Sequence, residues 1–220
     1  MILAGGCAPI YMPTSPNTPM LKESGETKVE MNATSSGFEF KGAHAVNVRM
    51  AIAAMVSGAS DPDEAGDESS FHRYAEASFI NYLRPGSMLV IENSGGLGVG
   101  VGKGHGQKLF TDGTFMAEGM YFKPFLQNNL ALQTRVVDIG LVNRLSVIRF
   151  TEIRSTLGDA EPITDPSTPL FWEPAIITQL GWDRFRINAH VGISTPLTGE
   201  PDFDWQGMLL GVGLGYRFGS

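Results

Sequence analysis

Cysteine, long apolar runs and basic residues are all scarce in this chain. Cys7 is the only cysteine among 220 residues, so neither an internal disulfide nor a thiolate metal site can form. No apolar run approaches the roughly 18 residues that a membrane-spanning helix needs. Lys and Arg number 16 against 23 Asp and Glu, which gives a net charge of −7 and disfavours nucleic acid as a partner. Disulfide-stapled, helical membrane and nucleic-acid-binding proteins are therefore all disfavoured.

Glycine, by contrast, is abundant, and much of it lies in segments that alternate like β-strands. The clearest segment is the last, from Gln206 to Phe218. Successive side chains of a strand point to opposite faces, so one face carries Met208, Leu210, Val212, Leu214, Tyr216 and Phe218. The other face carries Gly207, Leu209, Gly211, Gly213, Gly215 and Arg217. An apolar face opposite a small or charged face is typical of a strand with lipid outside and a narrow lumen inside.

Ten such segments, bounded by turn signals, follow one another along the chain. They lie near residues 26–34, 37–45, 47–57, 71–83, 87–102, 115–130, 134–150, 170–181, 184–194 and 205–218. No helical periodicity competes with them. We predict an all-β fold, an antiparallel up-and-down transmembrane β-barrel of ten strands, with eight strands as the alternative count.

The connections between these segments alternate in length. Those after the second, fourth, sixth and eighth are a few residues long, whereas those near 58–70, 103–114, 151–169 and 195–204 are long and mostly acidic. Outer-membrane barrels have short periplasmic turns and longer external loops. We therefore expect the long acidic loops outside the cell and both termini on the short-turn side.

The predicted lumen face gathers charges of both signs, which must pair because an unpaired buried charge is costly. We expect a lumen polar network of Glu76, Glu92, Asp138, Arg144, Glu173, Arg184, Arg186 and His190. Trp172 and Trp182 lie ten residues apart on one outward face, which projects to about 25 Å at a tilt of roughly 40°. This is the height of an apolar band, so we predict an aromatic girdle of Trp172, Trp182, Tyr216 and Phe218.

Signals for catalysis or cofactors are weak. His72 with Glu76, and His190 with Ser194, share a predicted face and are the best candidates for a barrel hydrolase. The four dispersed histidines make no metal site. The glycine-rich stretch 96–106 breaks the P-loop pattern, because Gly104 follows Lys103 where Ser or Thr is required. We predict no catalytic residue, no metal and no cofactor.

The N-terminal region differs from the rest of the chain. Leu3-Ala4-Gly5-Gly6-Cys7 is similar to the lipobox of bacterial lipoproteins, in which the cysteine becomes the lipidated N-terminus. We therefore interpret residues 1–6 as the remnant of a signal peptide whose start lies upstream. Residues 7–25 hold four prolines and no periodicity, so we expect a lipidated, extended tether. Residues 26–220 form the predicted barrel, and the lipid would then lie in the periplasmic leaflet.

Taken together, the chain resembles a family of small outer-membrane barrel lipoproteins of Bacteroidota. The resemblance rests on the Cys7 context, Asn17-Thr18-Pro19-Met20 leading to Gly25-Glu26, Glu173-Pro174-Ala175, and the closing Gly215-Tyr216-Arg217-Phe218. It implies an outer-membrane location and a barrel fold. It also implies an accessory role beside a larger secretion or uptake complex.

Three functions remain open from the sequence. The first is a structural or partner-docking barrel in contact with outer-membrane lipid, without nucleotide or nucleic acid. The second is a lipid-modifying or proteolytic barrel enzyme. The third is a lipid-anchored soluble barrel that binds an apolar ligand. The sequence favours the first.

Overall fold

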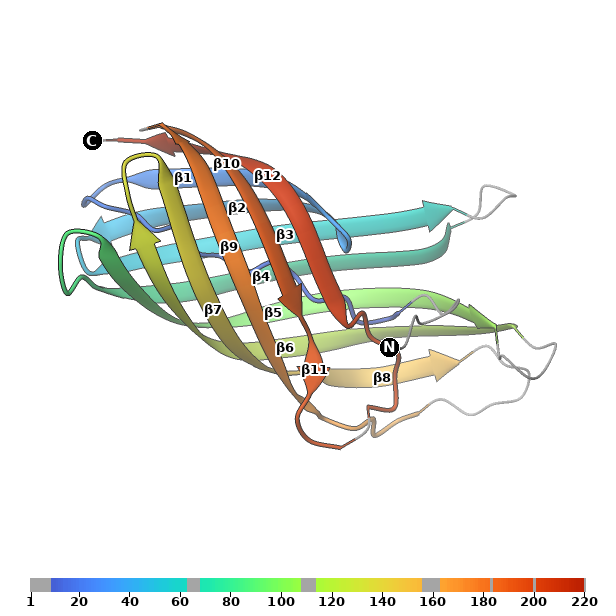
Figure 1. The fold of residues 1–220 in the computed structure, drawn as a ribbon. Helices are drawn as coiled ribbons and strands as arrows, with labels where there is room; N and C mark the ends of the chain where they lie inside the picture. The colour runs from blue at the N-terminus through green and yellow to red at the C-terminus, as the bar shows by residue number, and fades with distance from the viewer. Residues whose placement is uncertain are drawn as a thin grey trace.

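The computed structural model describes residues 9–62, 68–107, 114–155, 163–182, 184–199 and 201–219, which form one closed antiparallel barrel (Figure 1). Its strands are β1 (Thr27–Thr34), β2 (Gly37–Asn47), β3 (Met50–Pro62), β4 (Glu68–Leu83), β5 (Leu89–Gln107), β6 (Thr114–Gln133), β7 (Val137–Val147), β8 (Arg149–Ser155), β9 (Leu170–Trp182), β10 (Phe185–Ile193), β11 (Thr195–Pro196) and β12 (Met208–Phe218). The described residues contain no helix, and hence none long enough to cross a membrane.

These twelve strands fill ten positions around the barrel. After Ile148, β8 continues β7 along β6, and after Ser194, β11 continues β10 along β9. Each of the ten positions pairs with the next along the chain, and β12 closes the ring by pairing with both β10 and β1. The predicted ten-stranded up-and-down barrel is confirmed, and the eight-stranded alternative is wrong.

Several strands run further than the sequence predicts. The expected loop at 58–70 is largely strand, because β3 extends to Pro62 and β4 begins at Glu68. Backbone hydrogen bonds between neighbouring strands are formed whatever the side chains are, so polar residues such as Ser60 and Ser70 do not end the pairing.

The two faces of each strand separate as the alternation predicts. Along β12, Leu210, Val212 and Leu214 point outward and are exposed, whereas Leu209 and Arg217 point inward and are buried. The same division holds along β10, where Ile187 and Val191 are exposed and Arg186 and His190 are buried. A soluble barrel packs its apolar face inside. This barrel turns it outward, as contact with hydrocarbon requires.

The barrel has two unlike ends. At the short-turn end, β2–β3, β4–β5, β6–β7 and β9–β10 are joined by tight connections and β12 ends (Figure 1, left). At the long-loop end lie the connections after β3, β5, β8 and β11. Thr27 of β1 pairs with Phe218, so β1 begins at the short-turn end as expected. The acidic residues within 63–67 and 156–162 lie outside the described residues.

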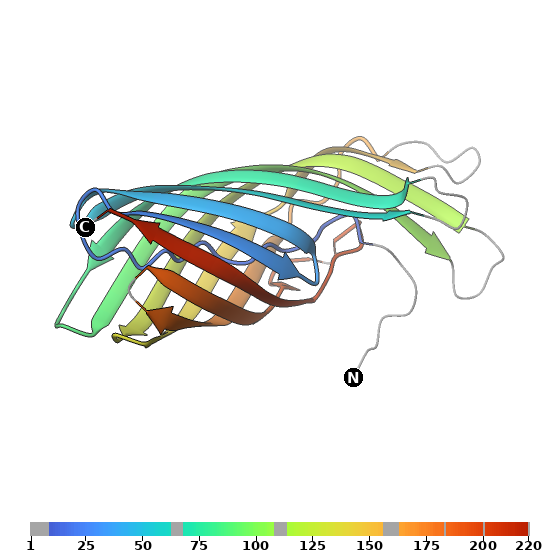
Figure 2. The ribbon, with the colours of Figure 1, turned by 90° about the horizontal axis from the view of Figure 1, so that it is seen from above.

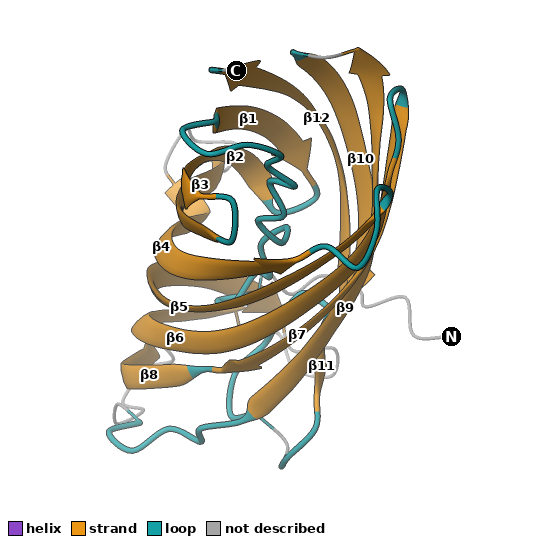
Figure 3. Cartoon of the chain, turned by 90° about the vertical axis from the view of Figure 1, so that its left-hand side faces the viewer, coloured by secondary structure: helices purple, strands orange, loops and turns teal. Residues whose placement is uncertain are grey.

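The expectation of a tether separate from the barrel is wrong for most of residues 7–25. Residues 10–21, hereafter the lumen segment, run through the inside of the barrel and are almost all buried (Figures 2 and 3). The segment is extended, as expected, because Pro13, Pro16 and Pro19 exclude helix. Its beginning lies at the long-loop end, where Tyr11 forms a parallel β-bridge with Trp205. Cys7 itself lies outside the described residues.

Candidate functional site in the barrel lumen

Inward side chains hold the main chain of the lumen segment. Two of its N–H groups donate to carboxylates: Ser15 to Glu39 of β2 and Met20 to Glu92 of β5, each at 2.8 Å. Its carbonyls accept hydrogen bonds from six long side chains, namely Lys41 to Pro16, Gln127 to Asn17, Gln179 to Thr18, Gln133 and Arg217 to Met20, and Arg84 to Leu21. Buried peptide groups without partners are costly. The barrel wall supplies those partners around the whole circumference.

The lumen polar network consists of three groups of ion pairs. Nearest the long-loop end, Arg144 of β7 lies 3.3 Å from Glu76 of β4, and Lys123 of β6 lies 3.1 Å from Glu173 of β9. Tyr11 of the lumen segment donates a hydrogen bond to Glu173. All of these side chains are buried. The lumen segment is therefore tied into the ion pairs through its tyrosine.

A second group closes the short-turn end. Asp138 of β7 lies 3.8 Å from Arg186 and 3.7 Å from Arg217, and Arg217 lies 3.6 Å from Glu26. Partial burial, and then the nearby Arg217 guanidinium, lower the pKa of Lys22, which lies outside the strands. Two guanidinium groups and two carboxylates thus surround the point where the chain leaves the lumen.

On the inward face of β1 and β2 lie ion pairs that the sequence analysis missed. Lys28 contacts Glu30 at 2.7 Å along β1, and Lys41 contacts Glu39 at 3.6 Å along β2. Each pair is two residues apart and on the inward face, so extending the strand alternation through residues 26–45 was a sufficient signal to find them.

The predicted network is otherwise placed as expected, with one correction. Glu76, Glu92, Asp138, Arg144, Glu173, Arg186 and His190 are all buried inside the barrel. Arg184 is not part of the network. It has the correct phase, but β10 begins only at Phe185, so Arg184 lies in the turn and is exposed.

An aromatic cluster fills the long-loop end of the lumen. Tyr11 packs edge-on against Tyr121 with ring centroids 5.6 Å apart, and Phe150, Phe171 and Phe203 continue the cluster. Glycines of β5 make room for it. A side chain at Gly98 or Gly100 would meet the ring of Tyr74 or Tyr121, and one at Gly102 would meet the carbonyl of Ile10. These three glycines of β5 are therefore required by packing.

Neither candidate catalytic pair forms. The Nε2 atom of His72 lies 2.6 Å from the hydroxyl of Tyr121, while Glu76 is paired with Arg144 and Tyr74. The hydroxyl of Ser194 donates to Glu173, not to His190. Within the described ranges, no three metal-ligating side chains gather in one place.

The predicted girdle residues all lie on the outer surface. Trp182, Tyr216 and Phe218 are exposed at the short-turn end, where Trp182 pairs across strands with Phe185. Trp172 is exposed on the same face of β9, toward the long-loop end. The two ends of β9 therefore carry tryptophan on one outward face.

No protein-family model and no curated protein matches the chain. Among solved structures it is similar to the KdgM porin, at 12% identity and a TM-score of 0.41, covering 88% of this chain and 99% of that one. The same porin in complex with disordered oligogalacturonate gives 12% identity, a TM-score of 0.39 and the same coverage. The translocator domain of autotransporter NalP from Neisseria meningitidis gives 10% identity and a TM-score of 0.43, covering 88% of this chain and 87% of that one. At identities of 10–12%, these similarities carry no information about the ligands or partners of this protein.

Proposed function

We propose that the chain is an outer-membrane β-barrel lipoprotein with a structural or partner-docking role, and that it is not a conducting pore. The observation that carries this proposal is the lumen segment. Residues 10–21 occupy the lumen, and side chains from β2, β5, β6, β9 and β12 bind its main chain. Ten strands leave a narrow lumen in any case. Because the interior of such a barrel is filled, only its outer wall and its loops are free to contact partners.

The outer wall supports a membrane location. Exposed apolar side chains encircle it, from Phe38 of β2, 71% exposed, to Trp182 of β9, 72% exposed. Exposed apolar surface on this scale is unfavourable in water and favourable in hydrocarbon. It disfavours the hypothesis of a soluble, lipid-anchored barrel. The enzyme hypothesis has no catalytic pair to support it.

We further propose that Cys7 carries the lipid, at the long-loop end. Tyr11 lies at that end, and four residues span at most about 14 Å. This replaces the periplasmic leaflet expected from the sequence, because the lumen segment carries the chain through the barrel. The lipid and the acidic loops would then share the outer surface, beside a larger secretion or uptake complex. Mass spectrometry of natively exported protein should find an acylated N-terminal Cys7.

Electrical recording in planar bilayers tests the closed lumen. The full chain is expected to give no stable current steps under applied voltage. A variant that lacks residues 10–21 is expected to conduct, because the ion pairs of the wall would then face water. Steady conductance by the full chain would contradict the proposal.

A further inference from the structure

Four asparagines form a row across the lipid-facing wall. Asn81 of β4 is in register with Asn93 of β5, Asn93 with Asn128 of β6, and Asn128 with Asn143 of β7. All four are exposed. The amide of Asn128 donates to Asn93 at 2.8 Å. For the side chains of Asn81 and Asn143, the described part of the chain offers no hydrogen bond.

The row begins near the short-turn edge of the apolar wall at Asn81 and runs into the middle of the wall at Asn128 and Asn143. Asn143 lies between the outward residues Leu141 and Leu145, and Asn128 between Leu126 and Leu130. Because the strands are tilted, the row moves from the short-turn end toward the long-loop end as it passes from β4 to β7. Asn81 is two residues from the end of β4, whereas Asn143 is six residues into β7. Polar side chains at membrane depth are costly in lipid and typically pair with other protein groups. On the opposite wall, the outward faces of β10 and β12 are apolar throughout.

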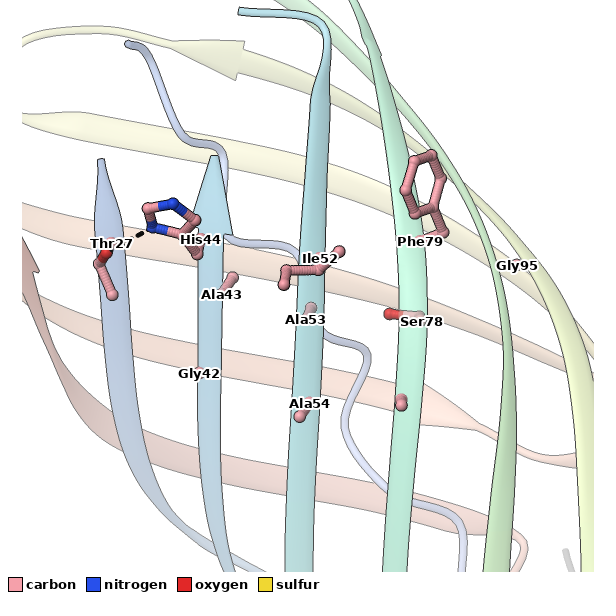
Figure 4. A pocket seen from close by; sticks show the side chains of 11 residues that line it. Thr27, Gly42, Ala43, His44, Ile52, Ala53, Ala54, Ser78, Phe79 and Gly95 are labelled. Atoms are coloured by element: carbon pink, nitrogen blue, oxygen red, sulfur yellow. Dashed lines mark hydrogen bonds between the residues drawn. The ribbon is translucent and has the colours of Figure 1, made fainter. Parts of the chain in front are cut away.

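A shallow apolar groove of about 610 Å³ adjoins this row (Figure 4). Gly42, Ala54 and Ala77 form its floor, and Ile52 and Phe79 border it. Two residues beyond Phe79 along β4 lies Asn81, and two residues before Gly95 along β5 lies Asn93. The wall of a barrel is convex and meets another convex surface poorly. Small residues hollow the wall here and permit close approach, as they do at helix interfaces in membranes.

We infer that this face, the asparagine row of β4–β7 with the adjoining groove, binds a second copy of the chain within the membrane. This inference rests on the proposed membrane location, and it names the partner as a second copy of the chain. A carboxamide carries both donor and acceptor, so an identical row is complementary to it, and its neutrality avoids repulsion between two acidic chains. Lipid tails offer no hydrogen bonds.

A two-fold axis along the membrane normal, passing over β5, makes the two faces fit. It sets Asn93 opposite its own copy, and β6 opposite β4 of the partner. Leu126 of β6 is 70% exposed, and through Gly95 it is in register with Phe79 of β4. Because register rows climb from β4 to β6, Leu126 lies near the depth of Ala77. Leu126 therefore faces the groove of the partner. The same patch supplies both the protruding side chain and the groove that receives it, as an isologous contact requires.

Crosslinking of the full chain in lipid nanodiscs tests this dimer. With Cys7 replaced by Ser, the double variant Ala77→Cys/Leu126→Cys is expected to form disulfide-linked dimers, and Val191→Cys on the opposite wall is expected not to. The double variant Asn128→Leu/Asn143→Leu should lower the dimer fraction at least tenfold. Asn128→Gln, which keeps the carboxamide, should retain the dimer, and Val212→Leu is the matched control on the other wall.

A monomeric wild-type chain, or a dimer that survives the leucine substitutions, would overturn the inference. Equal crosslinking at Val191 would overturn it as well. These outcomes are separate from the conductance test: a monomer that does not conduct contradicts the dimer alone, and a conducting dimer contradicts the closed lumen alone.

Discussion

Single residues in the lumen are held by charge pairing in a buried interior. Arg144 is 1% exposed, lies near Glu76, and also stacks over Phe125 with its guanidinium 4.4 Å from the ring centroid. Its Nε donates to Gln127 at 2.9 Å. Every polar contact of this guanidinium comes from another strand. The pair therefore fixes β4 against β7 across the lumen.

Replacing Arg144 by Met tests this pairing. Breaking a buried ion pair from one side costs about 3–5 kcal/mol, because the other charge stays buried without compensation. We expect a loss of that size in the free energy of unfolding, measured by urea titration in lipid vesicles. The double variant Glu76→Gln/Arg144→Met should recover most of it.

The exposed pair of Arg154 with Glu152 provides the matched control. Solvent screens this pair, so Arg154→Met should leave the urea midpoint unchanged. If the Arg144→Met and Arg154→Met variants unfolded at the same midpoint, the buried pair would not contribute as argued.

At the scale of the elements, the inward face of β5 is shaped to accommodate the lumen segment. The inward face of β5 is glycine from Gly98 to Gly104, and the backbone of Ile10 lies directly over Gly102. A strand with larger inward side chains would have no room for a second chain in the lumen. The glycines that weaken an ordinary strand are needed here for close approach.

Gly102→Ala tests this fit. Its Cβ would meet the carbonyl oxygen of Ile10, which is backbone and cannot rotate away. We expect the start of the lumen segment to be displaced, with a loss of about 1–3 kcal/mol as for other overpacked sites. Faster hydrogen exchange at residues 10–16 would report the displacement.

Gly58→Ala is the control for this change. The nearest atom to its Cβ is the His72 carbonyl oxygen at 3.8 Å, an ordinary contact. Hydrogen exchange in the lumen segment should be unaltered in the Gly58→Ala variant. Unaltered exchange in the Gly102→Ala variant too would show that β5 and the segment do not constrain each other.

At the scale of the whole molecule, the path of the chain decides which side each end faces. β12 ends at the short-turn end, whereas Tyr11 lies at the long-loop end beside Trp205. The lumen segment is thus the only part of the described chain that crosses the barrel on the inside. The two ends of the described chain lie at opposite ends of the barrel.

Epitope tags test this path. A tag inserted between residues 7 and 9 and a tag within 197–207 are expected to be digested together by a protease added to one side of the membrane. A tag after residue 220 should be protected in the same experiment. Digestion of the N-terminal and C-terminal tags together, with the 197–207 tag protected, would mean that the chain does not pass through the lumen.

The sequence by itself determined the barrel and about half of its lumen charges. Alternation with a period of two is a local property, so the inward positions of Glu76, Asp138, Arg144 and Arg186 could be read from neighbouring residues alone. Turn signals and alternating connection lengths gave the strand count and the two ends. The alternation also places Arg184 on the inward face, but the sequence did not show that β10 begins only at Phe185.

The tertiary structure alone decided where residues 10–21 lie. Their prolines predict an extended chain but contain no information about what surrounds it. The groups that bind its main chain, from Glu39 to Arg217, come from strands far apart in sequence and converge only once the barrel closes. The asparagine row depends on the same closure, because its four members come into register only when β4–β7 pair. Long-range convergence of this kind is a property of the closed sheet, and no single segment carries it.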